Sequence, residues 1–158
     1  MNAVSLDRID HIIIKHLLED GRASFSSLAK ETNLTDVAIK KRVESLKRKG
    51  VIKAISAELN YKVLGFENPI FVQMRSEISK NKDLTKKLNS FDFVVELYQV
   101  LGEYNLIAKL IIQDLETAER VINQLGTIDG ILDLKTLVVI SELKKSKSLP
   151  SQTLQKTF

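Results

Sequence analysis

The sequence predicts an α+β fold in two parts, a three-helix bundle with a helix-turn-helix followed by a four-stranded sheet with two helices. Residues 1 to 52 carry apolar residues at helical spacing, which predicts helices only. Residues 69 to 142 alternate strand and helix patterns in the order βαββαβ, the order of ferredoxin-like sheets. With 158 residues, 44% of them hydrophobic, the chain is long enough for two small domains, or for one domain and an interface between copies.

Four apolar residues ahead of Gly21 predict the first helix: Leu6, Ile9, Ile13 and Leu17. They recur at helical spacing, so they form one stripe. This stripe can pack across the next two helices and close a three-helix core.

The next helix is predicted to begin after a serine cap, either Ser24 or Ser26, since both hydroxyls can accept from backbone N–H groups of the first turn. It buries Leu28 and Ala29. The turn formers around Asn33 end it.

The third helix has the clearest boundaries. Thr35 caps it, and Ile39, Val43 and Leu46 recur at i, i+4 and i+7, which places them on one inward stripe. Gly50 is its expected stop. The two helices and their turn therefore predict a helix-turn-helix over residues 24 to 52.

The outward side of this third helix is the candidate DNA-reading surface. The residues predicted to face a groove near its start are Thr35, Asp36, Val37, Lys40 and Lys41. Between positions 40 and 53 there are seven basic residues and one acid, a density that suits phosphate contacts. The phosphate candidates are Arg22, Arg42, Lys47, Arg48 and Lys49. An isolated basic run is more often a solvated face, but its union with a helix-turn-helix favours DNA.

Three of these residues have alternative roles. Asp36 could accept from a cytosine amino group, or only stabilise the first turn through the helix dipole. Arg22 could contact a phosphate or tie the helices together. Arg42 lies beside Val43 near the core, so pairing with an acid competes with a DNA contact.

The segment after Gly50 alternates loosely over residues 51 to 59, which predicts a short strand or an extended wing. Gly65 and Pro69 then mark a hinge. The predicted division is a DNA-binding domain over 1–52, a hinge strand over 53–68, an effector and oligomerisation domain over 69–142, and a flexible basic tail over 143–158. The tail could attract DNA nonspecifically or pack on a neighbour.

Four strands are predicted in the second part: 70–78, 93–101, 106–112 and 131–140. The second and third are joined by Gly102 to Asn105, which suits a hairpin loop. One helix is predicted after a cap at Ser79 or Asn81, with Leu84 and Leu88 one turn apart. The other is capped by Asp114, stops at Gly126 and has an apolar stripe of Leu115, Ala118, Ile122 and Leu125.

Both faces of the predicted sheet are apolar. In the third strand Leu106, Ala108, Leu110 and Ile112 oppose Ile107 and Ile111, and in the fourth Leu132, Leu134, Val138 and Ile140 oppose Ile131, Leu137 and Val139. Helices cover only one face of such a sheet, so the second face needs another cover. The same face of a second copy is the simplest, which predicts a homodimer.

Charge and composition narrow the class further. Residues 1 to 62 hold twelve basic and eight acidic side chains, whereas 63 to 142 hold eight and twelve, so the amino-terminal part faces a polyanion. There is no Cys, which excludes disulfides, thiolate metal sites and a Cys nucleophile. Without an apolar leader or a span of roughly 20 apolar residues, we expect no membrane contact and a cytoplasmic protein.

No catalytic centre is predicted. His11 and His16 are five positions apart rather than the four of a helical metal pair, and no third ligand is evident. The sequence has no Gly-rich phosphate loop and no nucleophile motif. We therefore expect no enzyme, no metal and no cofactor.

A set of short motifs from Leu6 to Val139 resembles the Lrp/AsnC family, also called feast/famine regulatory proteins. The motifs are Leu6-Asp7-Arg8-Ile9-Asp10, Asp20-Gly21-Arg22, Leu28-Ala29, Arg42-Val43-x-x-Leu46, Gly50-Val51-Ile52, Gly102-x-x-Asn105 and Thr136-Leu137-Val138-Val139. Each one is weak, but the ordered set is specific.

The resemblance implies a winged or plain helix-turn-helix domain and a ferredoxin-like effector domain that dimerises and assembles further, often to octamers. It also implies that an amino acid or related small metabolite binds near the hairpin loop and the last strand. The implied effector residues are Gly102, Glu103, Tyr104, Asn105 and Thr136. The family usually has Asp where this chain has Asn105, and several members have a small hydroxyl residue where it has Leu134, so the effector could differ or be absent.

These patterns together predict a sequence-specific transcriptional regulator that binds double-stranded DNA as a homo-oligomer and responds to a small metabolite. One alternative is an architectural protein that wraps DNA with little sequence choice and has no effector. An alternative of another class is a small-molecule-binding or catalytic ferredoxin-like module with an incidental helical appendage.

Overall fold

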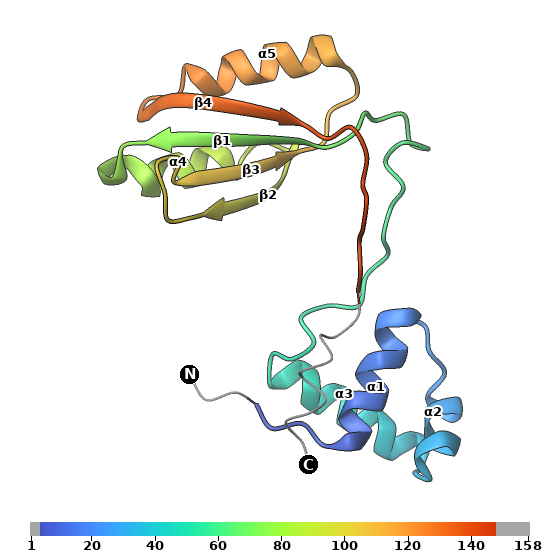
Figure 1. Ribbon diagram of the computed structural model, residues 1–158. Helices are drawn as coiled ribbons and strands as arrows, with labels where there is room; N and C mark the ends of the chain where they lie inside the picture. The colour runs from blue at the N-terminus through green and yellow to red at the C-terminus, as the bar shows by residue number, and fades with distance from the viewer. Residues whose placement is uncertain (1–3, 148–158) are drawn as a thin grey trace. The chain divides into compact units, whose positions relative to one another are not determined.

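The computed structural model describes residues 4–147, which divide into two compact units (Figure 1). The helical unit contains residues 4–58 together with 144–147, and the sheet unit contains residues 59–143. The four-part division expected from the sequence stays a prediction, and residues 148–158 of its basic tail lie outside the described residues.

The helical unit has three helices whose caps follow from the sequence. They are α1 (Arg8–Glu19), α2 (Phe25–Thr32) and α3 (Asp36–Arg48). Ser24 rather than Ser26 caps α2, and Thr35 caps α3 as predicted. At α1, Asp7 and Asp10 accept from each other's backbone N–H, a reciprocal capping box.

The turns of this unit depend on two residues with left-handed backbone. Asn33 ends α2 at φ 55°, a conformation that asparagine tolerates better than most residues. Gly50 follows α3 at φ 72°, where glycine avoids the steric cost of a Cβ atom. Both were predicted as stops.

The core of the helical unit is the predicted inward stripe. Ile39, Val43 and Leu46 of α3 pack with Ile13 of α1 and Leu28 of α2, and each of the five is at most 1% exposed. Burying such side chains contributes roughly 1.5–3 kcal/mol each. The three helices therefore pack against one another, and the opposite side of α3 is exposed to solvent.

The strand predicted after Gly50 does not form in the described residues. Residues 52–60 form neither helix nor strand, and turns occupy 61–65, so the hinge strand expected over 53–68 is absent among the described residues. A strand needs a partner that exchanges backbone hydrogen bonds with it along a ladder, and in the described residues no ladder includes this segment, which the tail meets through side-chain ion pairs to Glu58. The helix-turn-helix thus has the plain form.

The sheet unit has the predicted βαββαβ order. Its elements are β1 (Ile70–Ser76), a 3-10 turn η1 (Ile78–Lys80), α4 (Asn81–Leu88), β2 (Val94–Gln99), β3 (Leu106–Leu110), α5 (Leu115–Gly126) and β4 (Ile131–Val138). The strands lie in the order β2-β3-β1-β4, with every neighbouring pair antiparallel. The ferredoxin-like prediction is confirmed.

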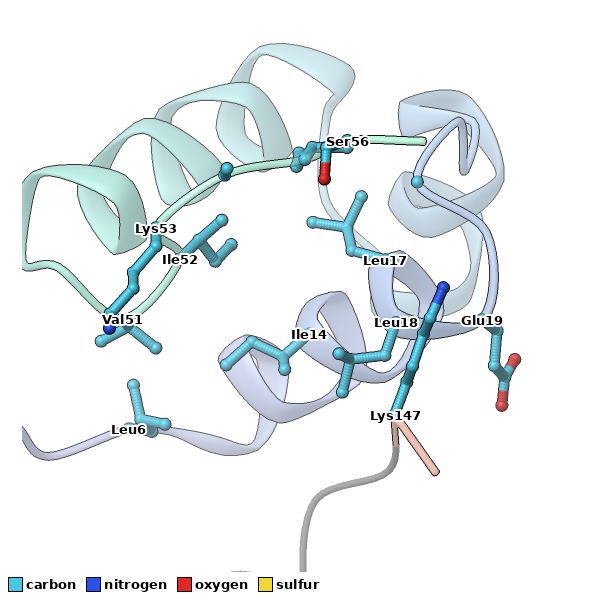
Figure 2. A pocket seen from close by; sticks show the side chains of 13 residues that line it. Leu6, Ile14, Leu17, Leu18, Glu19, Val51, Ile52, Lys53, Ser56 and Lys147 are labelled. Atoms are coloured by element: carbon cyan, nitrogen blue, oxygen red, sulfur yellow. The ribbon is translucent and has the colours of Figure 1, made fainter. Parts of the chain in front are cut away.

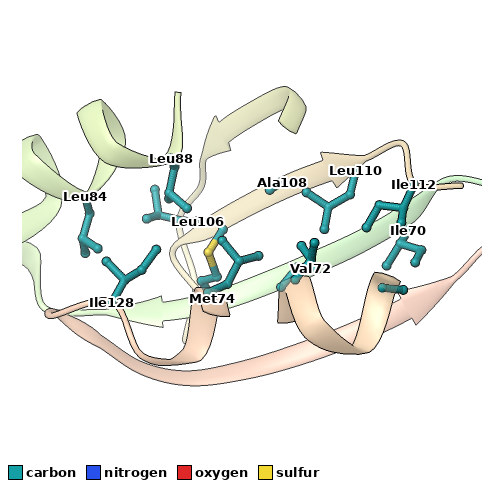
Figure 3. Close-up of a cluster of buried hydrophobic side chains, with 13 residues drawn as sticks. Ile70, Val72, Met74, Leu84, Leu88, Leu106, Ala108, Leu110, Ile112 and Ile128 are labelled. Carbon is teal, nitrogen blue, oxygen red and sulfur yellow. The ribbon is translucent and has the colours of Figure 1, made fainter. Parts of the chain in front are cut away.

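Both helices cover the same face of this sheet (Figure 3). Leu84 and Leu88 of α4 share one buried cluster with Val72 and Met74 of β1 and with Leu125 of α5, and all five are at most 2% exposed. The opposite face of the sheet receives no helix of the unit. It carries the alternate residues of each strand.

Two details of the helices differ from the sequence prediction. α4 begins without a side-chain cap, because Ser79 belongs to the preceding 3-10 turn and Lys80 occupies the cap position. In α5 Asp114 caps as predicted, but Leu115 of the predicted apolar stripe is 66% exposed. Val121, which was not part of that stripe, is buried together with Ala118 and Leu125. The helix also continues through Gly126 to a cap at Thr127.

The start of β4 departs from simple alternation. Arg75 pairs with Asp133, whereas Ser76 pairs with Ile131, so Leu132 is an extra residue that bulges from the ladder. As a result Ile131 packs on the same core as Leu134, and Leu132 is 56% exposed. The sequence predicted that Leu132 and Leu134 share one face of the sheet and that Ile131 lies on the other. This prediction was wrong for Ile131 and Leu132.

None of the helices within residues 4–147 is both long and apolar enough to cross a membrane.

Candidate nucleic-acid interface

The amino-terminal end of α3 presents an exposed surface of mixed chemistry. Thr35 accepts from the Ala38 backbone N–H at 3.2 Å and so fixes the start of the helix. Val37 is 63% exposed, and Lys40 and Lys41 are exposed one turn further on. Because positions 37, 40 and 41 recur at helical spacing away from the buried stripe, they share one outward side.

Asp36 connects the two helices of the helix-turn-helix. Its Oδ2 accepts from the Ser26 hydroxyl at 3.0 Å, so the first turns of α2 and α3 are joined by a side-chain hydrogen bond. Both residues are exposed. The sequence suggested Ser26 only as a cap, since a contact between two exposed residues leaves no periodic signal.

Arg42 faces α1 rather than solvent. Its Nη1 donates to Asp7 Oδ2 at 2.7 Å and to Asp10 Oδ1 at 2.9 Å, and its side chain is 33% exposed. Of the two roles that the sequence left open, the structure places Arg42 in the acid pairing. Because Nη1 donates to two carboxylates, the geometry favours the pairing role of Arg42, and its phosphate contact stays a prediction.

The same cluster shifts two pKa values. Burial opposes ionisation of Asp7, but hydrogen bonds from the Asp10 backbone and the Arg42 guanidinium outweigh it, so the pKa of Asp7 is lowered from 3.8. Hydrogen bonding to Asp7 raises the pKa of Arg42 above its usual value. Each charged group therefore stabilises the other in the folded unit.

This pairing predicts a pH dependence of the helical unit. The folded-state pKa of Asp7 lies below its unfolded value, so its stabilising contribution is complete above the unfolded pKa of 3.8 and is lost as pH falls through the folded pKa. The protection factors of the α1 and α3 amides, which correct for the intrinsic pH dependence of exchange, should fall on acidification below about pH 4. In Asp7→Asn this part of the fall should be absent; an identical acid profile in both proteins would contradict the assignment.

The remaining phosphate candidates are exposed. Arg48 and Lys49 have no ion pair within residues 4–147, and Lys47 lies 3.7 Å from Glu44 on its own helix. Arg22 is 93% exposed, and its carboxylate neighbour Asp20 belongs to the same turn, so the pairing does not tie helices together. Such exposed cations are available to a polyanion.

The first residues of the tail return to the helical unit. Lys145 and Lys147 both pair with Glu58, and these hydrogen bonds lower the pKa of Glu58 to about 2. The described part of the predicted tail is thus held by the segment that follows α3.

A groove of about 480 Å³ lies beside this segment (Figure 2). Its walls are mainly apolar side chains, including Leu6 just before α1, Ile14 of α1 and Ile52 after α3, with Lys147 at its edge. The sequence did not predict this groove, because it depends on the course of residues 51–56 past α1.

The predicted effector loop, Gly102 to Asn105, connects β2 and β3 at one end of the sheet. Tyr104 donates to Asp133 at 2.7 Å, and its ring lies 5.5 Å from the Lys135 amino group. The hydrogen bond to Asp133 raises the pKa of Tyr104 and lowers that of Asp133. Gly102 and Glu103 are exposed at the loop surface.

Asn105 has an internal role in this loop. Its Oδ1 accepts from the Ser76 backbone N–H at 2.9 Å and lies 3.0 Å from the Ser76 hydroxyl, while its amide donates to the Ser76 carbonyl at 3.2 Å. The side-chain oxygen of Asn105, one of the implied effector residues, is therefore already used within the chain.

Thr136 does not join the loop within one chain. It pairs with Val72 and so belongs to the helix-covered side of the sheet, whereas Asp133, the partner of Tyr104, pairs with Arg75 on the other side. The structure thus brings together Tyr104, Asp133 and Lys135, and leaves Thr136 apart. Of these, Asp133 and Lys135 were not predicted from the sequence.

No group of three His, Asp or Glu side chains that could hold a metal ion occurs within residues 4–147. His16 instead contacts Glu31 at 2.9 Å, and the His11 ring bonds the Asp7 carbonyl at 2.8 Å. These residues help to connect and cap helices.

A basic, outward-facing recognition helix in a helix-turn-helix, carried on the same chain as a ferredoxin-like sheet unit, defines the class of helix-turn-helix transcriptional regulators with a separate regulatory domain. Comparison with protein families gives the same class twice: residues 6–47 match the AsnC-type helix-turn-helix domain and residues 70–149 the Lrp/AsnC ligand binding domain. The chain belongs to the Lrp/AsnC family of transcriptional regulators.

Individual relatives agree along nearly the whole chain. The HTH-type transcriptional regulator LrpA of Pyrococcus horikoshii is 31% identical over 140 residues, which are 88% of this chain and 99% of that protein. The structure of AsnC from E. coli is similar with a TM-score of 0.83 and 27% identity, covering 92% of this chain and 100% of that one. A Neisseria meningitidis regulator in complex with L-Met shares the fold, with a TM-score of 0.85 and 21% identity over 95% of this chain and 99% of that one.

Proposed function

We propose that this regulator binds specific DNA sites in the cytoplasm as a symmetric dimer or larger assembly, and that a small metabolite tunes its binding. The observation that carries the proposal is the amino-terminal end of α3, where Val37, Lys40 and Lys41 are exposed together on a fixed helix. A helix presented in this way can enter a major groove, with its first residues at the base edges. No catalytic role is assigned to any residue.

The roles divide between reading and positioning. Thr35, Asp36, Val37, Lys40 and Lys41 approach the bases, and Arg22, Lys47, Arg48 and Lys49 contact phosphates. Arg42 positions α3 on α1 through Asp7 and Asp10.

The uncovered face of the sheet supports the dimer. Phe71 pairs with Leu137, and Tyr98 pairs with Ile107, so four apolar or aromatic side chains lie on the side that neither α4 nor α5 covers. Tyr98 is 51% and Leu137 47% exposed. A second copy would bury both through the same residues, which is how a two-fold interface forms.

Leu137→Glu is therefore expected to convert the dimer to monomer, because a carboxylate would be buried without a partner at a two-fold interface. Leu115→Glu is the matched control, since Leu115 is also exposed but lies on α5, on the covered side of the sheet. Sedimentation equilibrium measures the mass of each protein. An unchanged mass in Leu137→Glu would refute this interface.

The effector proposal is supported by the family of the sheet unit and by the polar end of the sheet. Residues 70–149 match a ligand binding domain, and a regulator of the same fold was crystallised with L-Met. In this chain Tyr104, Asp133 and Lys135 offer hydroxyl, carboxylate and ammonium groups in one place. Asn105, held by Ser76, shapes the loop that carries Tyr104.

Selection of genomic DNA fragments by the purified protein, with and without a panel of amino acids, tests the whole proposal. A small set of enriched sites whose occupancy changes with one amino acid would support it. Random recovery in every library, with a steep salt dependence, would support the architectural alternative instead. Failure to retain DNA even at low salt would refute DNA binding.

A further inference from the structure

We propose that Asp36 selects a cytosine in the DNA site and that Ser26 holds it in the reading position. The inference rests on the proposed function, because it assigns one base contact within the proposed DNA interface. It starts from the single acidic side chain at the front of an otherwise basic helix surface.

Asp36 is placed where a recognition helix meets base edges. It is the first residue of α3, directly after the Thr35 cap, and it is exposed. Val37 beside it is 63% exposed, and Lys40 lies one turn further along. The amino-terminal residues of such a helix are the ones that reach bases in the major groove.

One oxygen of the Asp36 carboxylate accepts a hydrogen bond within the described residues, and the other accepts none. Oδ2 accepts from the Ser26 hydroxyl at 3.0 Å, and no ion pair of Asp36 occurs within residues 4–147. Each carboxylate oxygen has two lone pairs, so Oδ1 can accept a further hydrogen bond. An unpaired acid next to Lys40 and Lys41 weakens attraction to phosphate, so it disfavours DNA unless the DNA offers a donor.

The donors of the major groove are few. Cytosine presents its N4 amino group, whereas guanine presents O6 and N7 and thymine presents O4, all acceptors that repel a carboxylate. Adenine offers an N6 donor, but its N7 acceptor lies beside it. Among the four bases, cytosine therefore suits Asp36 best.

Ser26 acts through Asp36. A hydrogen bond from α2 restricts the rotamers of the Asp36 side chain, and a restricted side chain loses less entropy when it binds a base. Ser26 is thus a positioning residue. Its loss should blur the preference for cytosine more than it weakens binding overall.

The test is selection of binding sites from random double-stranded DNA by the full chain, followed by sequencing. We expect wild-type protein to prefer cytosine at one position of each half-site by about tenfold over other bases. Asp36→Asn should move the preference at that position to adenine, because an asparagine amide pairs with adenine N6 and N7. Ser26→Ala should reduce the cytosine preference severalfold, and Ser26→Thr, which keeps the hydroxyl, should restore it.

Glu44→Gln is the matched control. It removes the same charge from the same helix two turns later, where Glu44 lies near Lys47, so the base preference should not move. If Glu44→Gln shifted the same position as Asp36→Asn, the effect would be one of charge and the inference would fall. If wild-type protein selected a site that Asp36→Asn left unchanged, the inference would fall and the proposed function would stand. If wild-type protein selected no site at all, both would fall.

Discussion

Replacing Lys40 and Lys41 together by alanine is expected to weaken binding to a specific DNA site by about 100-fold or more. Both side chains lie exposed at the front of α3. A direct base contact contributes about 1–3 kcal/mol, and the double variant removes two such interactions from each half-site of a dimer. No other interaction of the fold depends on these two ammonium groups in the described residues, so the protein should remain folded and assembled.

Fluorescence anisotropy on a selected site measures the loss. Lys86→Ala with Lys87→Ala is the matched control, since this pair removes two exposed charges from α4 in the sheet unit and leaves the net charge of the two double variants equal. The control should bind DNA within about threefold of wild type if its lysines lie outside the interface. Equal affinity of the two double variants would refute the reading role of α3.

The salt dependence of DNA binding by the same double variant distinguishes phosphate contacts of Lys40 and Lys41 from base contacts. If Lys40 and Lys41 bind phosphates, the slope of log K against log salt should become shallower by about 0.9 for each phosphate that the variant no longer neutralises. If they bind bases, the affinity should fall with little change in slope and the site preference should relax. Either result supports an interface at α3.

Replacing Arg42 by methionine is expected to destabilise the helical unit by about 2 kcal/mol, because two carboxylates would lose their cation. Asp10 is only 8% exposed, and Arg42 donates to it at 2.9 Å. Methionine keeps most of the volume of the side chain, so lost packing contributes little. DNA binding should fall too, since the position of α3 on α1 depends on this pairing.

Hydrogen exchange of α1 and α3 measures this loss without relying on the sheet unit. Arg48→Met is the control, because Arg48 lies on the same helix and has no ion pair within residues 4–147; its effect should stay within about 0.5 kcal/mol. Adding Asp10→Asn to Arg42→Met should recover part of the lost stability. If Arg42→Met behaved like Arg48→Met, the pairing would be of no consequence for stability.

Much of the fold could be predicted from the sequence because it depends on interactions between residues that are close along the chain. Ser24, Thr35 and Asp114 cap helices through backbone groups three residues away, and Ile39, Val43 and Leu46 form a stripe by helical spacing alone. The order of elements in the second part predicted the sheet topology, because a short hairpin loop makes neighbouring strands antiparallel. The family motifs lie in these same local segments.

Several predictions failed where a distant part of the chain decides. The extra residue Leu132 inverted the faces at the start of β4 because the register is set by pairing with β1. Leu115 carries the apolar chemistry of the α5 stripe, but it lies in the first turn and remains exposed. The expected hinge strand does not form among the described residues, because no other segment of 4–147 shares a backbone ladder with residues 53–68.

The sequence by itself determined the two-part α+β fold, the helix-turn-helix and the location of the basic surface, since periodicity, caps and charge act within a few residues. Only the tertiary structure decided which of those residues are available. It pairs Arg42 with Asp7 from 35 positions away, Asp36 with Ser26, and Asn105 with Ser76. A side-chain hydrogen bond has a fixed short length and direction, so its partners depend on how the helices and strands pack and not on their spacing along the chain. The basic helix therefore reads DNA, in our proposal, with fewer cations and one better-placed acid than its sequence suggested.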